Sequence, residues 1–91
     1  MLDVLKIRED FPMLKKTMHG KPLIYLDNGA TTLKPQCVID SVCDYLTNYS
    51  GNAHRGDYDL SHEVDTKFEY VRSIVADFIH CKPKEVVYTY G

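Results

Sequence analysis

Residues 52–59 combine side chains that can bind an anion. His54 and Arg55 stand between Gly51 and Gly56 in a stretch without apolar periodicity. Arginine offers a planar fork of N–H donors to a carboxylate or phosphate, and histidine carries a proton near neutral pH. The flanking glycines indicate a backbone with a defined shape. We therefore expect an anion-binding loop or, as the alternative, a surface loop with one ion pair.

A second polar segment, residues 27–32, predicts a turn that exposes main-chain amides. Asn28 and Gly29 tolerate unusual backbone angles, and Ala30 adds little bulk. Pro35 suits the first turn of the helix that is expected to follow. Free amides and the positive end of a helix dipole favour anions at such a position. The alternative is a plain helix cap.

The three cysteines, Cys37, Cys43 and Cys81, match neither a metal-binding knuckle nor a disulfide framework. Cys37 and Cys43 fall in one expected helix, on nearly opposite faces, so they cannot share a metal ion. We expect reduced thiols and no metal site. No cysteine has an activating neighbour in sequence, and we assign no catalytic residue to this chain.

Apolar residues at helical spacing predict the helices that must position these polar segments. The first follows Asp3, which can act as N-cap, and closes at Pro12; the second runs from Pro35 to about Ser50; the third is capped by Ser61. The apolar stripes expected to form the core are Val4, Ile7 and Phe11, then Val38, Val42, Tyr45, Leu46 and Tyr49, then Val64, Phe68, Val71, Val75 and Phe78.

Two short strands are expected, at residues 23–26 and 85–90, because both runs are rich in β-branched or aromatic residues and flanked by turn signals. Residues 19–22 form one of those turn signals. Two such strands make a sheet that is marginal in water and has exposed edges. We therefore expect one truncated α/β unit.

The composition is that of a small soluble globular chain. Hydrophobic residues make up 44% and charged residues 26% of the 91 residues, which excludes disorder. Eleven basic and 13 acidic residues leave a net charge of −2 without a basic run, so nucleic acid is not an expected partner. No stretch approaches the ~20 apolar residues of a membrane span, and residues 1–10 lack the basic-then-apolar order expected of a secretory signal. We expect a cytoplasmic location, no membrane partner, and a core too small for a complete metabolic enzyme.

Three motifs occur in order along nearly the whole chain. They are Tyr25-Leu26-Asp27-Asn28-Gly29-Ala30-Thr31-Thr32 followed by Lys34-Pro35, then Asn52-Ala53-His54-Arg55-Gly56 with Leu60-Ser61, then Val86-Val87-Tyr88-Thr89-Tyr90-Gly91. Together with the opening Arg8-Glu9-Asp10-Phe11-Pro12, they resemble the N-terminal portion of Suf-type cysteine desulfurases, which are pyridoxal-phosphate enzymes of the class V aminotransferase group.

The resemblance implies an α/β fold, with residues 1–91 as the N-terminal arm and start of the large domain of a fold-type-I pyridoxal-phosphate enzyme, itself mostly helical with one or two short strands. It implies that Asn28, Gly29 and Ala30 lie near the substrate carboxylate. It also implies that His54, Arg55 and Gly56 lie close to the active site at a dimer interface. The cofactor that the resemblance implies is pyridoxal 5'-phosphate, and its phosphate-binding turn would begin at Gly91.

The reaction implied by the resemblance converts L-cysteine to L-alanine and moves the sulfur to an enzyme cysteine persulfide, from which an acceptor protein takes it for iron–sulfur cluster assembly. We expect a homodimer when full length and no activity in the fragment. Family members commonly carry alanine at the position of Gly29 and histidine at that of Tyr58. The alternatives are a selenocysteine lyase or another class V enzyme, or a stand-alone binding or regulatory module.

Overall fold

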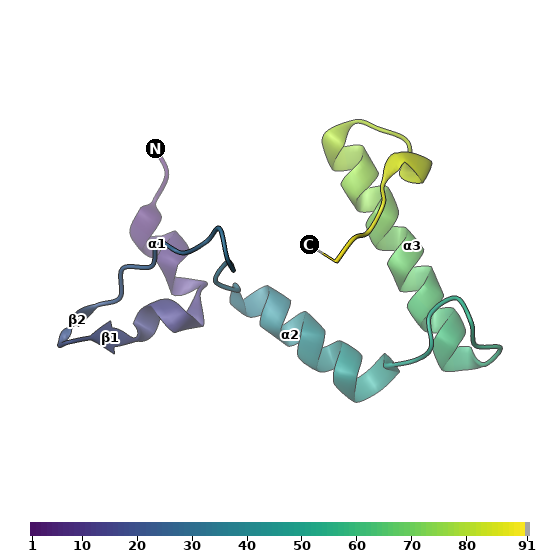
Figure 1. Cartoon of the computed structure of the whole chain (residues 1–91), viewed down its shortest axis with the longest axis horizontal. Coiled ribbons are helices and arrows are strands. Elements are labelled where there is room, and N and C mark those ends of the chain that lie inside the picture. Colours follow the sequence, from purple (N-terminus) through teal and green to yellow (C-terminus); the bar gives the residue numbers. More distant parts are fainter. Residues whose placement is uncertain (91) are drawn as a thin grey trace. The chain divides into compact units, whose positions relative to one another are not determined.

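Residues 1–90 are described by a computed structural model, in which the chain divides into two units, Met1–Tyr45 and Leu46–Gly91. We call them the N-terminal unit and the C-terminal unit. Helices predominate in both, and the only strands in the described part of the chain form one two-stranded sheet (Figure 1). The prediction of a mostly helical chain with one or two short strands is confirmed.

The first helix of the N-terminal unit, α1 (Val4–Glu9), begins as the sequence predicts. The Asp3 carboxylate accepts a hydrogen bond from the Lys6 N–H at 3.1 Å and so caps the helix. The helix ends earlier than predicted, and a separate 3-10 helix, Pro12–Lys15, follows. Phe11 lies between the two with an extended backbone, since the residue before a proline is disfavoured in the helical conformation.

A hairpin replaces the strand predicted at residues 23–26. Strands β1 (Thr17–Met18) and β2 (Lys21–Pro22) pair antiparallel around His19 and Gly20, whose φ angles are both positive, 55° and 74°. A two-residue turn of this kind matches the twist of a hairpin and places the strands directly beside it. Residues 23–26 form no ladder within the described residues; only Leu23 of this segment is buried.

Helix α2 (Gln36–Asp44) confirms the second predicted helix, and its last turn, Tyr45–Tyr49, continues as a π-helix. Pro35 occupies the N-cap rather than the first turn, with an extended backbone. The Gln36 N–H donates to the Asp10 carbonyl at 2.7 Å, which ties the start of α2 to the end of α1. The predicted core residues of this helix are not buried, and Val42 remains 52% exposed.

Helix α3 (Asp59–Ile79) is the long helix of the C-terminal unit, and it begins two residues before Ser61. The N-cap is Tyr58, so the prediction that Ser61 caps the helix is wrong. Ser61 is fully buried in the first turn, and its hydroxyl donates to the Asn52 carbonyl, which holds the preceding loop. The helix ends at His80, which adopts a left-handed conformation with φ 58°.

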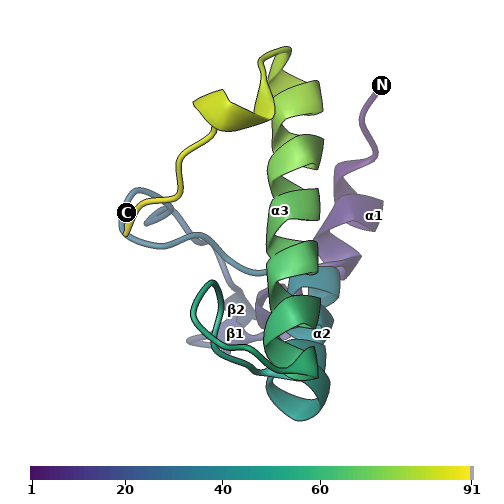
Figure 2. The same cartoon turned by 90° about the vertical axis from the view of Figure 1, so that its right-hand side faces the viewer.

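After a 3-10 helix, Pro83–Glu85, the chain runs extended along α3, as Figure 2 shows for the yellow segment beside the green helix. The predicted strand at residues 85–90 has no ladder partner within the described residues. Its polar groups bond to α3 instead: the Val86 carbonyl accepts from Arg72, and the Tyr88 hydroxyl donates to the Phe68 carbonyl at 3.2 Å.

Fewer residues of the apolar stripe predicted on α3 are buried than expected. Val64 is buried, as predicted, together with Ala76 and Val86. Phe78, which was expected in the core, is 84% exposed. Because Val86 packs from outside the helix, the buried face of α3 is the one that receives the extended segment.

Candidate functional site

The polar turn at residues 27–32 is closed by its own hydrogen bonds. The N–H groups of Ala30 and Thr31 both donate to the Asp27 carbonyl, at 3.1 and 3.2 Å. The Tyr25 hydroxyl lies 2.5 Å from the Thr31 carbonyl and braces the turn from one side. Two of the amides expected to be free are therefore used within the turn, while those of Asn28 and Gly29 have no partner among residues 1–90.

Helix α2, which follows the turn, begins at Gln36, one residue later than predicted. The helix dipole acts within about one turn of the helix end. Residues 33–35 separate the turn from the first residue of α2, and anion binding by this segment stays a prediction. The groups of the turn that remain free to bind a ligand are the Asn28 side chain and the N–H groups of Asn28 and Gly29, which have no partner among residues 1–90.

Gly29 does not need to be glycine in this turn. Its φ is not in the left-handed region, and a Cβ added there would meet no atom within 4 Å. The alanine that family members commonly carry at this position would fit the backbone as it stands. The difference in sequence therefore leaves the shape of the turn unchanged.

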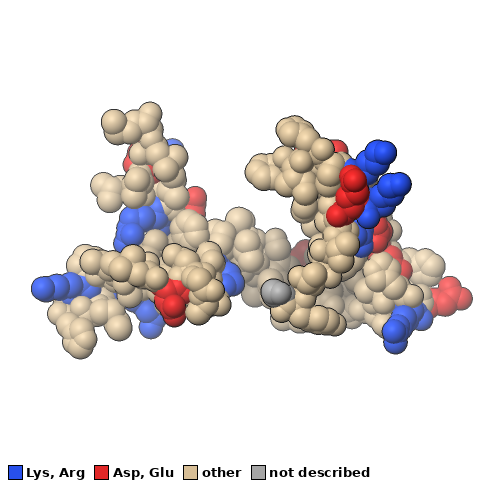
Figure 3. All heavy atoms as spheres, turned by 45° about the horizontal axis from the view of Figure 1, so that its top comes forward, with Lys and Arg blue, Asp and Glu red and all other residues tan. Residues whose placement is uncertain are grey.

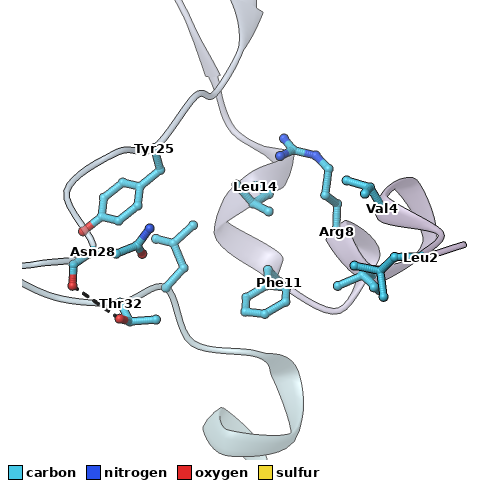
Figure 4. A pocket seen from close by; sticks show the side chains of 10 residues that line it. Leu2, Val4, Arg8, Phe11, Leu14, Tyr25, Asn28 and Thr32 are labelled. Atoms are coloured by element: carbon cyan, nitrogen blue, oxygen red, sulfur yellow. Dashed lines mark hydrogen bonds between the residues drawn. The ribbon is translucent and has the colours of Figure 1, made fainter.

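A pocket of about 250 Å³ lies between α1 and the turn. Figure 4 shows Tyr25, Asn28 and Thr32 on one side of it and Leu2, Val4 and Arg8 on the other. Sequence reasoning missed Arg8, whose guanidinium donates to the Leu23 carbonyl at 3.4 Å. Its position one turn after Val4 on α1 was the signal that could have placed it beside the apolar wall.

The loop at residues 52–58 is anchored to α3 through His54. The His54 N–H donates to the Asp65 carboxylate at 2.6 Å, and its Nδ1 lies 3.4 Å from the same oxygen. The imidazole meets the Phe68 ring edge-on, with centroids 5.1 Å apart. These contacts hold His54 in a left-handed conformation with φ 62°, which is uncommon for a residue with a side chain.

Gly56 anchors the other end of the same loop by close approach. A Cβ at this position would lie 2.5 Å from the Ser61 Oγ and would overlap a ring carbon of Tyr58, so only glycine fits. The Tyr58 hydroxyl accepts from the Asn52 N–H at 2.9 Å. Tyr58, where the family commonly has histidine, thus closes the loop on itself, and the prediction of a shaped backbone is confirmed.

Arg55 stands between these two anchors with an exposed side chain. Among residues 1–90 its guanidinium has no hydrogen-bond or ion-pair partner. A guanidinium in that state can bind a carboxylate or phosphate through two parallel N–H bonds without giving up an existing contact. Two other loop residues form the loop's ion-pair contacts, His54 with Asp65 and Asp57 with His62, and neither contact involves Arg55.

The extended segment is attached to the same face of α3. The Tyr88 ring packs on Phe68 with centroids 4.3 Å apart, and the Arg72 guanidinium carbon lies 4.9 Å from the centre of the Tyr88 ring. Phe68 therefore contacts both His54 and Tyr88. Gly91, the residue assigned to the cofactor phosphate, lies outside the described residues.

The predicted site residues fall in two groups. Asn28, Gly29 and Ala30 belong to the N-terminal unit, whereas His54, Arg55 and Gly56 belong to the C-terminal unit. Within the second group the structure places the three residues on one anchored loop. The residues that sequence reasoning did not connect with the loop are Asp65 and Phe68, of which Phe68 was predicted only as part of an apolar stripe.

Three further features bear on the class of ligand. No three side chains of the described residues come together as metal ligands. In the same part of the chain, no helix combines the length and the apolar character that crossing a membrane requires. Figure 3 shows basic and acidic side chains interspersed over the face in view, in keeping with the net charge of −2.

The sequence matches the family model described as "Aminotransferase class-V" over residues 24–91. It is 42% identical over 92 residues to a "Probable cysteine desulfurase" of Vibrio cholerae serotype O1, covering 100% of this chain and 23% of that protein. It is 44% identical over 84 residues to a "Probable cysteine desulfurase" of Synechocystis, covering 91% of this chain and 20% of that protein.

Among solved structures, the chain resembles the apo structure of a cysteine desulfurase from Thermococcus onnurineus NA1. The TM-score is 0.76 at 38% sequence identity, over 96% of this chain and 20% of that one. The chain thus spans only 20–23% of the length of these three proteins.

Proposed function

The chain belongs to the class V aminotransferase family, and we propose that it is the N-terminal part of a Suf-type cysteine desulfurase. Its fold is that of the N-terminal portion of a fold-type-I pyridoxal-phosphate enzyme. The full-length enzyme converts L-cysteine to L-alanine and passes the sulfur to a cysteine of the enzyme as a persulfide. The proposal is supported by the similarity to proteins named cysteine desulfurase over 91–100% of this chain.

In this proposal residues 1–91 form the arm and the start of the large domain, and they are inactive by themselves. The persulfide sulfur passes to an acceptor protein for iron–sulfur cluster assembly, and the full-length enzyme is a cytoplasmic homodimer. No residue of the described chain is assigned to bond making or breaking. The contribution of this chain is to hold the substrate.

In this proposal, Arg55 is the main residue of the chain that holds the substrate. The observation behind it is an exposed guanidinium without a partner among residues 1–90, on a loop anchored at both ends. Arg55 offers a planar fork of N–H donors to an anionic group near the active site at the dimer interface, with His54 and Gly56 shaping the loop. Asn28, Gly29 and Ala30 form the second substrate-binding segment, with the Asn28 side chain and the amides of Asn28 and Gly29 as its donors.

Pyridoxal 5'-phosphate, when bound, supplies the electron sink that lets the bonds at the substrate Cα be broken. Of the residues in this chain, only Gly91 is assigned to it, as the first residue of the turn that holds the phosphate. The segment that precedes Gly91 is bound to α3 through the Val86 carbonyl and the Tyr88 hydroxyl. These contacts support a fixed position for the residues that lead to the turn.

The experiment is an assay of the full-length protein loaded with pyridoxal phosphate. L-Cysteine should yield L-alanine and, with a reductant, sulfide in equal amounts, whereas residues 1–91 alone should yield neither. Selenocysteine serves as the competing substrate: a preference for it would favour a selenocysteine lyase. Absence of alanine from the loaded full-length protein would overturn the proposal.

A further inference from the structure

One stripe of α3 contacts two segments that lie far apart in the sequence. Asp65, Phe68 and Arg72 recur at i, i+3 and i+7, so their side chains leave the same face of the helix. The loop before α3 contacts the first two of them through His54. The extended segment after α3 contacts the last two through Tyr88. Within residues 1–90, Phe68 is therefore the member of this stripe that has ring contacts with both segments.

The contact of Phe68 with the loop supports an unfavourable backbone conformation. The His54 imidazole meets the Phe68 ring edge-on, with centroids 5.1 Å apart and an interplanar angle of 86°, a favoured arrangement of two rings. His54 has a φ of 62°, which a residue with a Cβ keeps only when its surroundings hold it. The hydrogen bond to Asp65 holds its main chain, and the Phe68 ring holds its side chain. The loop conformation thus depends on the position of the Phe68 ring.

The contacts of Phe68 with the extended segment are closer. The Tyr88 ring packs on the Phe68 ring with centroids 4.3 Å apart, and the Tyr88 hydroxyl donates to the Phe68 carbonyl at 3.2 Å. The Arg72 guanidinium donates to the Val86 carbonyl and has its central carbon 4.9 Å from the centre of the Tyr88 ring. Because rings at this separation are in direct contact, displacing Tyr88 removes support from the Phe68 ring.

The loop and the extended segment lie on the same side of α3 (Figure 2). Within residues 1–90, no hydrogen bond, ion pair or ring contact joins residues 52–58 directly to residues 86–90. In this unit, an effect of one segment on the other therefore passes through α3, and Phe68 is the place where the ring contacts of both meet.

We propose that Phe68 couples the loop at residues 52–58 to the extended segment at residues 86–90, so that loosening one segment destabilises the other. The coupling element is the Phe68 ring, which packs against His54 on behalf of the loop and against Tyr88 on behalf of the segment. A coupling free energy is reciprocal, so a ligand that holds the loop would also stabilise residues 86–90. This coupling goes beyond the proposed function and uses none of the chemistry of Arg55.

The test follows hydrogen exchange in the full-length protein loaded with pyridoxal phosphate, in one peptide covering residues 52–58 and one covering residues 86–90. The N–H groups of Asn52 and His54 are hydrogen-bonded in the structure, so their exchange reports opening of the loop. A peptide covering residues 36–44 in α2 is the internal reference, because a general loss of stability would speed its exchange as well.

Tyr88→Leu removes the ring that packs on Phe68. It should speed exchange of residues 52–58 at least about threefold, because the Phe68 ring then loses its support on the side of the segment. Tyr90→Leu is the matched control, since it is the same substitution in the same segment and Tyr90 is fully exposed. This control should change exchange of the loop by less than about 1.5-fold. The reference peptide should exchange at the same rate in both variants.

Phe68→Leu removes the shared ring and should speed exchange of both peptides. Adding Tyr88→Leu to Phe68→Leu should bring no further change in residues 52–58, because the contact that joins the two segments is already gone. If Tyr88→Leu speeds exchange of the loop as strongly in the Phe68→Leu background as in the native one, the effect follows another route and the proposed coupling is wrong.

Equal exchange of the loop in Tyr88→Leu and Tyr90→Leu would also overturn the coupling, and this comparison decides by itself should Phe68→Leu not fold. None of these measurements uses turnover of L-cysteine, so a failure of the coupling would leave the proposed function standing. Conversely, a loaded full-length protein that forms no alanine would end the proposed function without affecting the exchange results.

Discussion

The Cα of Gly56 approaches Ser61 so closely that a Cβ added at the glycine would lie 2.5 Å from the serine hydroxyl and 2.7 Å from its Cβ. Ser61 is fully buried and cannot withdraw into solvent. The loop that carries Arg55 is thus seated directly on the first turn of α3. The shape of the loop depends on this contact at one end and on His54 with Asp65 at the other.

Gly56→Ala should destabilise the protein by about 1–3 kcal/mol, because the new methyl group overlaps Ser61 and Tyr58 and must push the loop away from α3. The matched control is Gly29→Ala, where a Cβ meets nothing within 4 Å, and the expected change is within about 0.5 kcal/mol. Chemical denaturation measures both free energies of unfolding. Equal values for the two variants would show that the close approach at Gly56 is relieved without cost.

Arg55→Ala should weaken turnover of L-cysteine while changing the free energy of unfolding by less than about 0.5 kcal/mol, since the side chain is exposed and without a partner among residues 1–90. Arg55→Lys should be intermediate in turnover, because lysine keeps the charge but loses the planar fork. Steady-state kinetics and thermal unfolding are measured on the same preparations. A large loss of stability with turnover intact would mean that Arg55 is a structural residue.

Ser61→Ala should cost about 1–2 kcal/mol of stability, because it removes a fully buried hydroxyl that donates to the Asn52 carbonyl. Ser41→Ala on α2 is the control: the Ser41 hydroxyl also donates to a carbonyl, that of Cys37, but from an exposed position. The control should change stability by less than about 0.5 kcal/mol. Denaturant titration measures the free energy of unfolding of both variants. Equal values would mean that water replaces the Ser61 hydroxyl as the donor to the Asn52 carbonyl.

Tyr88→Phe should cost about 1 kcal/mol, because it removes the hydroxyl that donates to the Phe68 carbonyl at 3.2 Å and keeps the ring contact with Phe68. Tyr90→Phe, in the same extended segment, is the matched control, since Tyr90 is fully exposed and its hydroxyl has no partner among residues 1–90. Hydrogen exchange of residues 86–90 should accelerate only in Tyr88→Phe. Identical exchange in the two variants would show that the segment is held by other contacts.

Sequence reasoning was most successful where structure depends on neighbours within a few residues. The Asp3 cap on α1 and the existence of α2 and α3 follow from short-range periodicity and capping, and all are present. The strand predicted at residues 23–26 is wrong, and the one predicted at residues 85–90 has no ladder among the described residues, because a ladder needs a partner strand. Residues 85–90 have strand-like composition, yet their hydrogen bonds go to the side chain of Arg72 and the backbone of Phe68.

The candidate site also combines features that depend on neighbouring residues with features that depend on distant ones. The residue types in the Arg55 loop predicted a shaped backbone, which the structure has, and an anion site, which stays a prediction. They did not reveal Asp65, because a polar residue on a long amphipathic helix is ordinarily solvated and its partner lies eleven residues away. Ser61 was predicted as a cap from its type alone, and only the packing of the loop shows that its hydroxyl bonds backward to Asn52.

The sequence by itself therefore determined the helices, the positions of the turns and the family to which the chain belongs, since these depend on local propensity and on motif order. The tertiary structure alone decided which groups remain available for a ligand. The amides of Ala30 and Thr31 are consumed within their turn, while Arg55 stays unpaired between two anchors within the described residues. Availability is decided by contacts between residues distant in sequence, because every buried or closed polar group takes the partner that folding brings to it.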